Sequence, residues 1–370
     1  MAVRPGALES MVDFWHGKRI LVTGHTGFKG AWLSLWLLER GAHVTGIALP
    51  PETRPSLFEQ LNLASRIDHH ELDIRDGAAL RRLVIETAPD IVFHLAAQAL
   101  VLRSYRTPEE TWAINVMGTL NVLESLRALE GPTAAVMVTT DKVYENEEWE
   151  FAYRESDPLG GHDPYSASKA AMEILVSSWR RSFLIPEGRR IRVATARAGN
   201  VIGGGDWAEN RILPDIARAL AAGEPVRVRN PHAVRPWQHV LEPLSGYMLL
   251  AERLYENDDA TFQDAFNFGP AAGDERTVRE VVEEALKHWP GRWEDASTPG
   301  APHEARRLAL TVDRARLRLG WRPRWDFATA ITETIGWYRA ALEGDAPDIT
   351  ALTRGGLQRF EAVCAREGEA

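Results

Sequence analysis

The sequence predicts an α/β fold in which a doubly wound parallel sheet is joined to a smaller C-terminal domain. Three observations lead to this prediction. Strand-like and helical segments alternate from about residue 18 to 200, a glycine-rich turn follows the first strand, and the alternation becomes irregular after Asn200. Such alternation favours parallel strands connected by helices, which then cover both faces of the sheet.

The strands expected in the first half are short and apolar, as buried parallel strands are. They cover residues 18–23, 43–49, 90–95, 134–140 and 191–198, and the helices between them cover 28–40, 76–87, 108–129 and 164–183. The first helix has apolar residues at helical spacing and ends at Gly41. In the second half we expect helices over 212–222, 242–255, 277–288 and 327–342 and strands over 226–229 and 266–268.

Composition and charge argue against several classes of function. The 370 residues are 45% hydrophobic and 26% charged, and the net charge of −9 argues against nucleic acid or an anionic membrane as the main partner. No apolar run is long enough to span a membrane, and no targeting signal precedes the first strand. The single cysteine, Cys364, can form no intramolecular disulfide, and His69-His70 is expected at the surface, so we predict a soluble, cytoplasmic protein without a metal site.

A glycine-rich loop lies between the first strand and the first helix. Gly24, Gly27 and Gly30 form a G-x-x-G-x-x-G pattern, and such a tight turn lets the backbone approach a pyrophosphate closely. The helix that follows offers unpaired N–H groups to the anion. We therefore expect a Rossmann-like sheet that holds a dinucleotide here, although a purely structural turn is the alternative. The cofactor-binding residues expected in this loop are Gly24, Thr26, Gly27, Phe28, Lys29 and Gly30.

Two later stretches come where this architecture brings loops to the cofactor. They are Asp73-Ile74 and Ala96-Ala97-Gln98, and ordinary strand ends and helix caps are the alternative reading. The end of the second strand, at 47–50, has no carboxylate to hold a ribose hydroxyl, and no arginine follows before Arg54. This loop therefore leaves the choice between NAD and NADP open.

Tyr165 and Lys169 are four residues apart, so they share one face of a helix. A tyrosine hydroxyl titrates at about 10 in water, too high for a base at neutral pH. A neighbouring ammonium group and the charge of a cofactor would lower the pKa of Tyr165 and favour the phenolate. The pair is therefore a candidate proton relay, with a casual helix pair as the alternative.

These motifs, together with Thr139-Thr140 at the end of a strand, resemble the extended short-chain dehydrogenase/reductase superfamily. Further stretches resemble the CDP-glucose 4,6-dehydratases in particular, and they are spread from about residue 14 to 325. They are Gly24-His-Thr-Gly-Phe-Lys-Gly30, Thr140-Asp-Lys-Val-Tyr144, Arg197-Ala-Gly-Asn-Val-Ile-Gly-Gly-Gly-Asp-Trp207, Arg235-Pro-Trp-Gln-His239 and Pro302-His-Glu-Ala305.

The resemblance implies NAD-dependent conversion of CDP-glucose to CDP-4-keto-6-deoxyglucose, a hydro-lyase reaction of deoxysugar and O-antigen biosynthesis. It implies that Tyr165 takes the proton of the sugar 4-hydroxyl while a hydride passes to the nicotinamide. Lys169 would lower the Tyr165 pKa and hold the nicotinamide ribose, and Thr140 would bond the 4-oxygen. Water then leaves across carbons 5 and 6, and the hydride returns to carbon 6. Family members also pair through two long helices, here 108–129 and 164–183, which implies a homodimer.

Asp141 and Lys142 follow Thr140 directly. A 4,6-dehydratase needs an acid for the departing hydroxyl and a base at carbon 5. The dTDP-glucose enzymes carry Asp-Glu at these positions, so the resemblance assigns the acid role to Asp141. Lys142 could be the base only with a strongly lowered pKa. An electrostatic role for Lys142, with Tyr144 or another group as the base, and a simple strand-end salt bridge of Asp141 with Lys142 remain alternatives.

The resemblance also places the nucleotide diphosphate of the substrate in the second half. Guanidinium groups suit that duty because they bind phosphate oxygens in pairs. We divide the chain into an N-terminal extension (1–17), a dinucleotide-binding Rossmann domain (18–200), a mainly substrate-binding domain (201–345) and an unassigned C-terminal tail (346–370). The substrate-binding residues expected are Asn200, Arg211, Arg235, His239 and His303, with Arg229 and Glu304 as weaker candidates.

Two other functions compete with dehydration. A sugar-nucleotide 4-epimerase shares the glycine loop, Thr140 and the Tyr165–Lys169 pair, but it needs no acid such as Asp141 to expel water. A non-catalytic nucleotide-binding protein could keep the fold, yet it would have no need to retain all three of those reactive residues.

Overall fold

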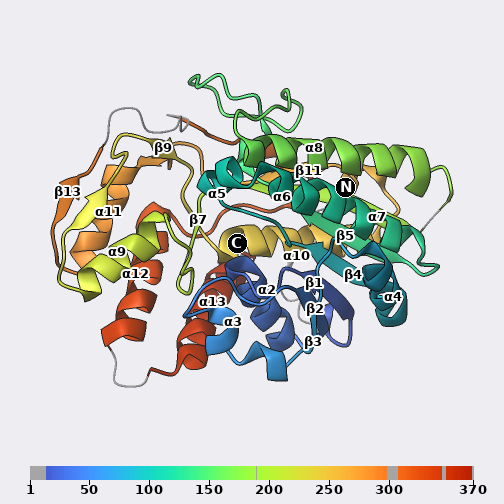
Figure 1. Ribbon diagram of the computed structural model, residues 1–370, viewed down its shortest axis with the longest axis horizontal. Helices are drawn as coiled ribbons and strands as arrows, with labels where there is room; N and C mark the ends of the chain where they lie inside the picture. The colour runs from blue at the N-terminus through green and yellow to red at the C-terminus, as the bar shows by residue number, and fades with distance from the viewer. Residues whose placement is uncertain (1–13, 189, 298–306, 344–346, 369–370) are drawn as a thin grey trace.

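A seven-stranded parallel sheet forms the centre of the computed structural model, which describes residues 14–188, 190–297, 307–343 and 347–368 (Figure 1). The strand order is β11-β6-β5-β4-β1-β2-β3. Because β1 lies inside the sheet and the chain leaves it in both directions, the loops after β1 and β4 meet at a topological switch point, where such sheets bind ligands. The strands are β1 (Arg19–Thr23), β2 (His43–Ala48), β3 (Asp68–Glu71), β4 (Ile91–His94), β5 (Thr133–Val138), β6 (Ile191–Ala198) and β11 (Ala265–Phe268).

The two faces of the sheet are covered by different helices. In β1, Ile20 and Val22 pack toward one face and Leu21 toward the other, as the two-residue period of a strand requires. The first face is covered mainly by α2 (Phe28–Glu39) and α10 (Leu241–Glu256). The second is covered by α4 (Gly77–Thr87), α7 (Thr119–Arg127) and α8 (Pro164–Trp179). The predicted doubly wound α/β sheet is confirmed.

The two long helices expected over 108–129 and 164–183 each contain a wider turn. The first consists of α6 (Pro108–Trp112), the π-helical segment η2 (Ala113–Gly118) and α7, and the second continues from α8 into the π-helical η4 (Arg180–Leu184). The shorter elements in the first half are α3 (Leu57–Gln60), η1 (Leu63–Ser65), α5 (Val101–Arg106) and η3 (Asp141–Val143).

After residue 200 the chain builds a second group of elements but also returns to the sheet. The strand expected over 266–268 is β11, which pairs with β6 as the edge strand of the central sheet, and α10 packs on β5 and β6. The other elements are β7 (Val201–Ile202), α9 (Ile212–Ala221), β8 (Val226–Val228), β9 (Val234–Arg235), β10 (Gln238–His239), η5 (Ala260–Phe262), β12 (Arg276–Thr277), α11 (Val278–His288), β13 (Trp293–Asp295), η6 (Ala315–Leu319) and α12 (Phe327–Glu343).

The C-terminal residues, which the sequence left unassigned, form the helix α13 (Ile349–Gly368). Its Phe360 is fully buried, with its ring 5.9 Å from that of Trp36 on α2 and 5.1 Å from that of Trp325. Glu361 accepts hydrogen bonds from the Trp36 indole (2.7 Å) and from Arg40 (2.6 Å). The end of the chain is therefore bound to its first helix.

The N-terminal extension has one described buried residue. Trp15 is completely buried, and its ring lies 6.1 Å from that of Phe93 in β4. The predicted extension therefore contributes Trp15 to the core. Among the described helices, none is long and apolar enough to cross a membrane.

Replacing Phe360 by Ala is expected to lower the free energy of unfolding by about 3 to 5 kcal/mol, because the aromatic ring is lost and a cavity remains between α2 and α13. Urea unfolding measures the change. The control is Leu317→Ala, whose side chain is 74% exposed, and a change of at most about 0.5 kcal/mol is expected there. Equal effects of the two substitutions would contradict the docking of α13.

Candidate active site

The three glycines of the first loop do different physical work. Gly24 has φ +77° and a Cβ there would lie 2.6 Å from the backbone nitrogen of Ala96, while a Cβ on Gly30 would overlap the Gly24 carbonyl. These two positions let α2 pack closely against the ends of β1 and β4. Gly27 is the N-cap of α2, and no side chain caps the helix there. The first amides of α2 are thus available to an anion, which fits a dinucleotide pyrophosphate.

The other predicted cofactor residues lie around this loop. Thr26 donates a hydrogen bond to the Leu49 carbonyl (2.9 Å) at the end of β2, and Ala96 and Ala97 follow β4 directly behind Gly24. Asp73 follows β3 and is paired with Arg75 (2.5 Å), whose hydrogen bonds and charge lower the Asp73 pKa against the effect of burial. Ile74 is buried beneath Gly118.

The side chain of Gln98, another predicted cofactor residue, is hydrogen-bonded to other parts of the protein. Its side chain donates to Thr111 (2.9 Å) and accepts from the Leu100 amide (2.6 Å). Asn115, in the π-helical turn η2, donates to the Gln98 carbonyl (3.1 Å) and to Ser168 on α8 (2.9 Å). The wider turn thus connects the loop after β4 to the helix that carries Tyr165 and Lys169. Sequence reasoning missed Asn115 because nothing in a continuous helical pattern marks a π turn.

Tyr165 is almost completely buried, and burial raises its pKa to about 12. A hydrogen bond with Thr140 and the charge of Arg211 act in the opposite direction. The Lys169 amine donates to the Val138 carbonyl (3.1 Å), and burial lowers the Lys169 pKa to about 8. The Tyr165 pKa was expected to be lowered by Lys169, but in the protein alone it is raised. The loss of solvation on burial outweighs the nearby positive charge.

Asp141 lies in the 3₁₀ turn η3, just beyond β5, and is 1% exposed. Its Oδ1 accepts a hydrogen bond from Thr140 (3.0 Å), and its Oδ2 is buried without a hydrogen-bond partner among the described residues. Gly199 lies against this carboxylate so closely that a Cβ there would overlap Oδ2. Lys142 follows on the same turn and is half-buried. The structure therefore brings Thr140, Asp141 and Tyr165 together.

Tyr144 belongs to a different, fully buried network. Its hydroxyl donates to Asn267 (2.7 Å) and accepts from Arg197 (2.9 Å), and burial raises its pKa. Both hydrogen bonds and the pKa argue against Tyr144 as a base at carbon 5. Arg197 is also paired with Glu173 on α8 (2.9 Å), and Glu173 accepts from Thr139, the residue before Thr140. Sequence reasoning did not identify Glu173, although its position four residues after Lys169 on one helix face could have indicated it.

The residues predicted to bind substrate differ in how near they lie to Tyr165 and in how exposed they are. Asn200 has φ +41° and its Oδ1 is buried without a partner among the described residues, while Arg211 lies 3.5 Å from Asp206 and its charge acts on Tyr165. Arg235 is buried on β9 and donates to the Val234 carbonyl (2.9 Å). Arg229 lies at the surface and donates to Asn210 (2.8 Å).

His239 is in the core. Its ring lies between Trp32 (5.9 Å) and Trp325 (4.8 Å), it is 3% exposed, and burial lowers its pKa to about 3. A neutral ring enclosed by aromatic side chains is poorly placed for the predicted contact with a phosphate, so the geometry indicates a packing role instead. His303 and Glu304 lie outside the described residues.

His69 is also less exposed than expected. It is half-buried, and its Nδ1 shares a hydrogen bond with the Nε2 of the buried His25 (2.8 Å). Because His25 belongs to the glycine loop, this hydrogen bond connects the loop to β3. No cluster of side chains within the described part of the chain could hold a metal ion.

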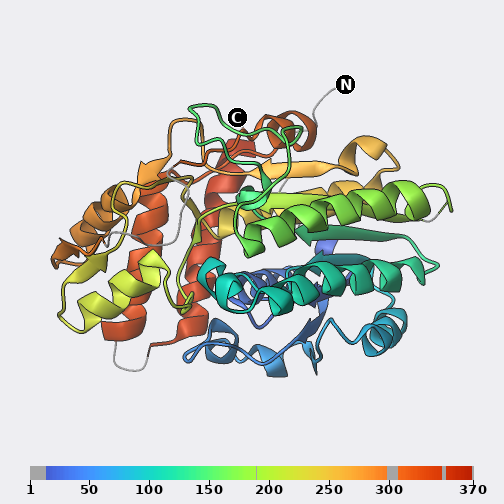
Figure 2. The same ribbon diagram turned by 45° about the horizontal axis from the view of Figure 1, so that its top comes forward.

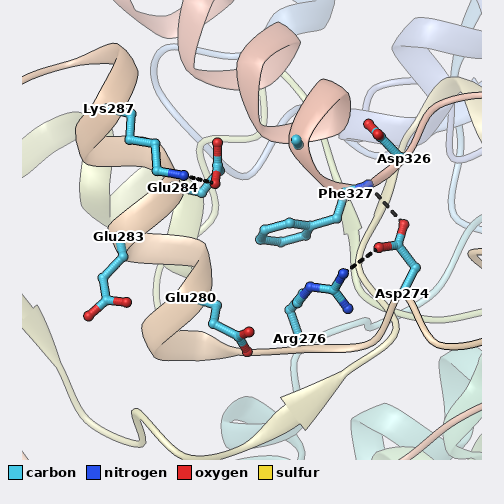
Figure 3. Close-up of a pocket in the computed structure, with 9 residues that line it drawn as sticks. Asp274, Arg276, Glu280, Glu283, Glu284, Lys287, Asp326 and Phe327 are labelled. Atoms are coloured by element: carbon cyan, nitrogen blue, oxygen red, sulfur yellow. Dashed lines mark hydrogen bonds and ion pairs between the residues drawn. The ribbon is translucent and has the colours of Figure 1, made fainter.

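The surface of the described residues has open cavities, among them the following two. One, of about 550 Å³, lies between the end of β2, α5 and the loop before α9, and Arg103 pairs with Glu52 (2.7 Å) in its wall. The other, of about 410 Å³, lies between α11 and the start of α12 (Figure 3). There Arg276 lies 3.0 Å from Asp274 and 5.6 Å from the centre of the Phe327 ring. The first cavity is lined by residues that follow β2 and β4, the two strands on either side of β1.

The glycine loop lies at the switch point of the sheet, and α8 places the buried Tyr165 and Lys169 at the same site. Together they define an enzyme of the extended short-chain dehydrogenase/reductase class. Solved structures agree with this assignment. A UDP-glucose 4-epimerase from Thermus thermophilus in complex with NAD has a TM-score of 0.74 and 26% identity, covering 87% of this chain and 99% of that one. A dTDP-glucose 4,6-dehydratase from Streptomyces venezuelae with NAD bound has a TM-score of 0.74 and 25% identity, covering 87% and 97%.

The chain belongs to the GDP-mannose 4,6 dehydratase family, whose sequence profile matches residues 21–334. A CDP-glucose 4,6-dehydratase from Salmonella typhimurium is 47% identical over 344 residues, which are 90% of this chain and 95% of that protein. A dTDP-glucose 4,6-dehydratase from Xanthomonas campestris is 31% identical over 86% of this chain and 92% of its own length. The family expected from the motifs is thereby confirmed.

Gly199→Ala is expected to lower turnover by about a hundredfold, because the added methyl group would displace the Asp141 carboxylate by about 1 Å. Gly131→Ala is the control, since a Cβ at that position meets no atom within 4 Å. Steady-state kinetics of both variants, with circular dichroism to confirm folding, makes the comparison. A folded Gly199→Ala protein with unchanged turnover would exclude a requirement for the observed position of Asp141.

Glu173→Gln is expected to cost about 3 to 5 kcal/mol of unfolding free energy at neutral pH, because Arg197 would be left buried without its counter-charge. The exposed pair of Arg279 with Glu283 provides the control Glu283→Gln, with an expected change of at most about 0.5 kcal/mol.

The pH dependence of this difference follows from the Glu173 pKa. Burial alone would raise that pKa, but the charge of Arg197 and hydrogen bonds from Arg197, Thr139 and Thr195 lower it overall. A carboxylate with a lowered pKa stabilises the fold above its unfolded pKa of about 4.3 and loses that contribution as the pH falls through its folded pKa. The stability gap between the parent and Glu173→Gln should therefore narrow in acid, and a constant gap in denaturation experiments would contradict the pairing.

Proposed function

We propose that this protein converts CDP-glucose to CDP-4-keto-6-deoxyglucose in an NAD-dependent dehydration. The observation that carries the proposal is the buried Asp141, held by Thr140 beside Tyr165, with one oxygen that receives no hydrogen bond from the described residues. An acid in this position serves the loss of water from carbon 6, which a 4-epimerase does not require. The choice of the cytidine nucleotide rests on the 47% identity with the Salmonella enzyme.

The chain fits a dinucleotide cofactor at the glycine loop. The uncapped amides of α2 suit the pyrophosphate. Gly24 and Gly30 have no side chains, so the backbone packs closely around this helix end without covering it. NAD, which is bound in two of the similar structures, is the cofactor proposed here. When bound, it supplies a hydride acceptor for carbon 4 and a hydride donor for carbon 6.

The side chains then divide the proton transfers. Tyr165 takes the proton of the 4-hydroxyl. Its pKa is raised even with the charge of Arg211 nearby, so the positive charge of a bound oxidised cofactor would have to lower it further. Thr140 bonds the 4-oxygen, and Asp141 gives a proton to the departing 6-hydroxyl. Lys142 remains a candidate for the base at carbon 5, and Lys169 for a contact with the cofactor ribose.

The substrate diphosphate is proposed to bind in the second half of the chain. Arg211 and Asn200 are the strongest candidates, because the Arg211 charge reaches Tyr165 and the Asn200 Oδ1 has no described partner. Arg235 is buried on β9, and it is a third candidate beside Arg211 and Asn200.

A homodimer is proposed from the exposed apolar residues on two neighbouring helices. The helix formed by α6, η2 and α7 lies beside α8 (Figures 1 and 2), and it exposes Trp112 (42%) and Met117 (52%) while α8 exposes Ile174 (60%). Paired helices of this kind bury apolar surface when two copies meet. The single cysteine supports a cytoplasmic location, and the product is a precursor for deoxysugars such as those of O-antigens.

The direct test incubates purified protein with NAD and a panel of glucose nucleotides and follows the product by mass spectrometry. Loss of one water from CDP-glucose, without accumulation of reduced cofactor, is the expected result. An unchanged mass with inversion at carbon 4 would establish an epimerase instead, the activity of the similar protein from Thermus thermophilus.

Tyr165→Phe is expected to lower turnover by about 10²- to 10⁴-fold while leaving the fold intact, because only the proton-transferring hydroxyl is removed. Tyr105→Phe, at a tyrosine that is 43% exposed, should retain the parent rate. Turnover of CDP-glucose by both variants is measured under saturating NAD. Parent-like turnover of Tyr165→Phe would refute the proton relay.

A further inference from the structure

Lys29 lies inside the active site rather than at its surface. It stands on the first turn of α2, is half-buried, and has its amine 5.9 Å from the centre of the Tyr247 ring. Tyr247 is completely buried on α10, and its hydroxyl has no hydrogen-bond partner among the described residues. The lysine therefore points away from solvent, into the space between α2 and α10.

The charged groups around this amine come from three different parts of the chain. Those that act on it are Arg211 before α9, Asp141 in η3, Lys169 on α8 and Asp206 in the loop after β7. Burial is the largest effect, and together with Arg211 and Lys169 it outweighs the two carboxylates and lowers the Lys29 pKa to about 7. The amine can therefore gain or lose a proton near neutral pH, unlike an exposed lysine.

One short segment of the chain connects the first turn of α2 with Asp141. The segment from Gly199 to Gly203 touches Asp141 at one end and the ring of Phe28 at the other. Four residue steps span at most about 14 Å, so the first turn of α2 and the catalytic acid are separated by no more than roughly that distance plus one contact at each end. A cofactor held by the amides of α2 and reacting beside Tyr165 would pass near the Lys29 amine, on whose charge both Asp141 and Lys169 act.

We propose that Lys29 compensates the change in charge of the nicotinamide, being neutral beside the oxidised ring and protonated beside the reduced ring. The inference rests on the NAD dependence in the proposed function. The oxidised ring carries one positive charge, which disfavours a second positive charge nearby, and the reduced ring is neutral. When the ring gains a hydride, two electrons and one proton are added, its charge falls from +1 to zero, and the amine takes one proton from solvent.

This coupling has a direct consequence for cofactor binding. The Lys29 pKa is higher in the complex with NADH than in the complex with NAD, so protons favour NADH. The ratio of NADH affinity to NAD affinity is then high at low pH, falls as the pH rises between the two pKa values, and becomes constant above them. One proton is involved, so the slope is at most about tenfold per pH unit.

An alternative role for Lys29 is a contact with the cofactor pyrophosphate. Both redox forms carry the same pyrophosphate, so such a contact strengthens their binding equally and leaves the affinity ratio unchanged. The ratio, and not either affinity alone, therefore separates the two roles.

The test measures binding of NAD and of NADH by calorimetry between about pH 6 and 9, for the parent protein, Lys29→Met and Lys287→Met. Lys287 is 66% exposed on α11, so its substitution removes the same charge far from the ring. We expect the ratio to depend on pH in the parent and in Lys287→Met, and to be independent of pH in Lys29→Met.

Three results would overturn the inference. They are a ratio that does not depend on pH in the parent, a slope that persists in Lys29→Met and so belongs to Lys169 or another group, and an equal loss of both affinities in Lys29→Met with an unchanged slope. A parent protein that binds neither NAD nor NADH would instead overturn the proposed function. Because no sugar is present, failure to dehydrate CDP-glucose leaves this test unaffected.

Discussion

The buried ion pair between Glu173 and Arg197 is the interaction on which the geometry of the active site depends. Glu173 lies on α8, two turns beyond Tyr165, and accepts hydrogen bonds from Thr139 at the end of β5 and Thr195 in β6. Arg197 reaches Tyr144 from β6. One carboxylate therefore connects the helix that carries Tyr165 with the strand end that carries Thr140 and Asp141. A charge pair this deeply buried is costly to desolvate, but removing one member is costlier, so the arrangement is strongly specified.

Next to this network, the site contains buried polar groups that lack hydrogen-bond partners among the described residues. Asp141, Asn200 and Tyr247 each have a buried oxygen without a hydrogen-bond partner among the described residues. Such atoms reduce stability unless a ligand or water pairs with them. Their concentration around Tyr165, together with the lowered pKa values of Lys29 and Lys169, is typical of a catalytic centre that is completed by cofactor and substrate.

The second half of the chain is bound to the sheet at several places. β11 is the last strand of the sheet, α10 covers one of its faces, and α13 closes over α2 through Phe360 and Glu361. Gly199 and Gly203 lie on the connection between the halves, against Asp141 and Phe28 respectively. Residues from the two halves consequently share one core, and the substrate-side loops are positioned by the same packing that positions the cofactor loop.

The sequence by itself determined the alternating α/β fold, most strand and helix positions and the glycine loop, because these depend on local periodicity and on spacing along one chain segment. Spacing also made Tyr165 and Lys169 a candidate pair, and resemblance to the family added Thr140 and Asp141 to it. Tertiary structure decided the rest. It placed His239 between two tryptophans, Tyr144 in a buried network and β11 in the central sheet, and it formed a π turn at Asn115. It also set the pKa of Tyr165 through burial, and it placed the amine of Lys29, a residue already expected at the cofactor, beside the ring of Tyr247. Burial and charge proximity depend on residues far apart in sequence, so no local pattern encodes them.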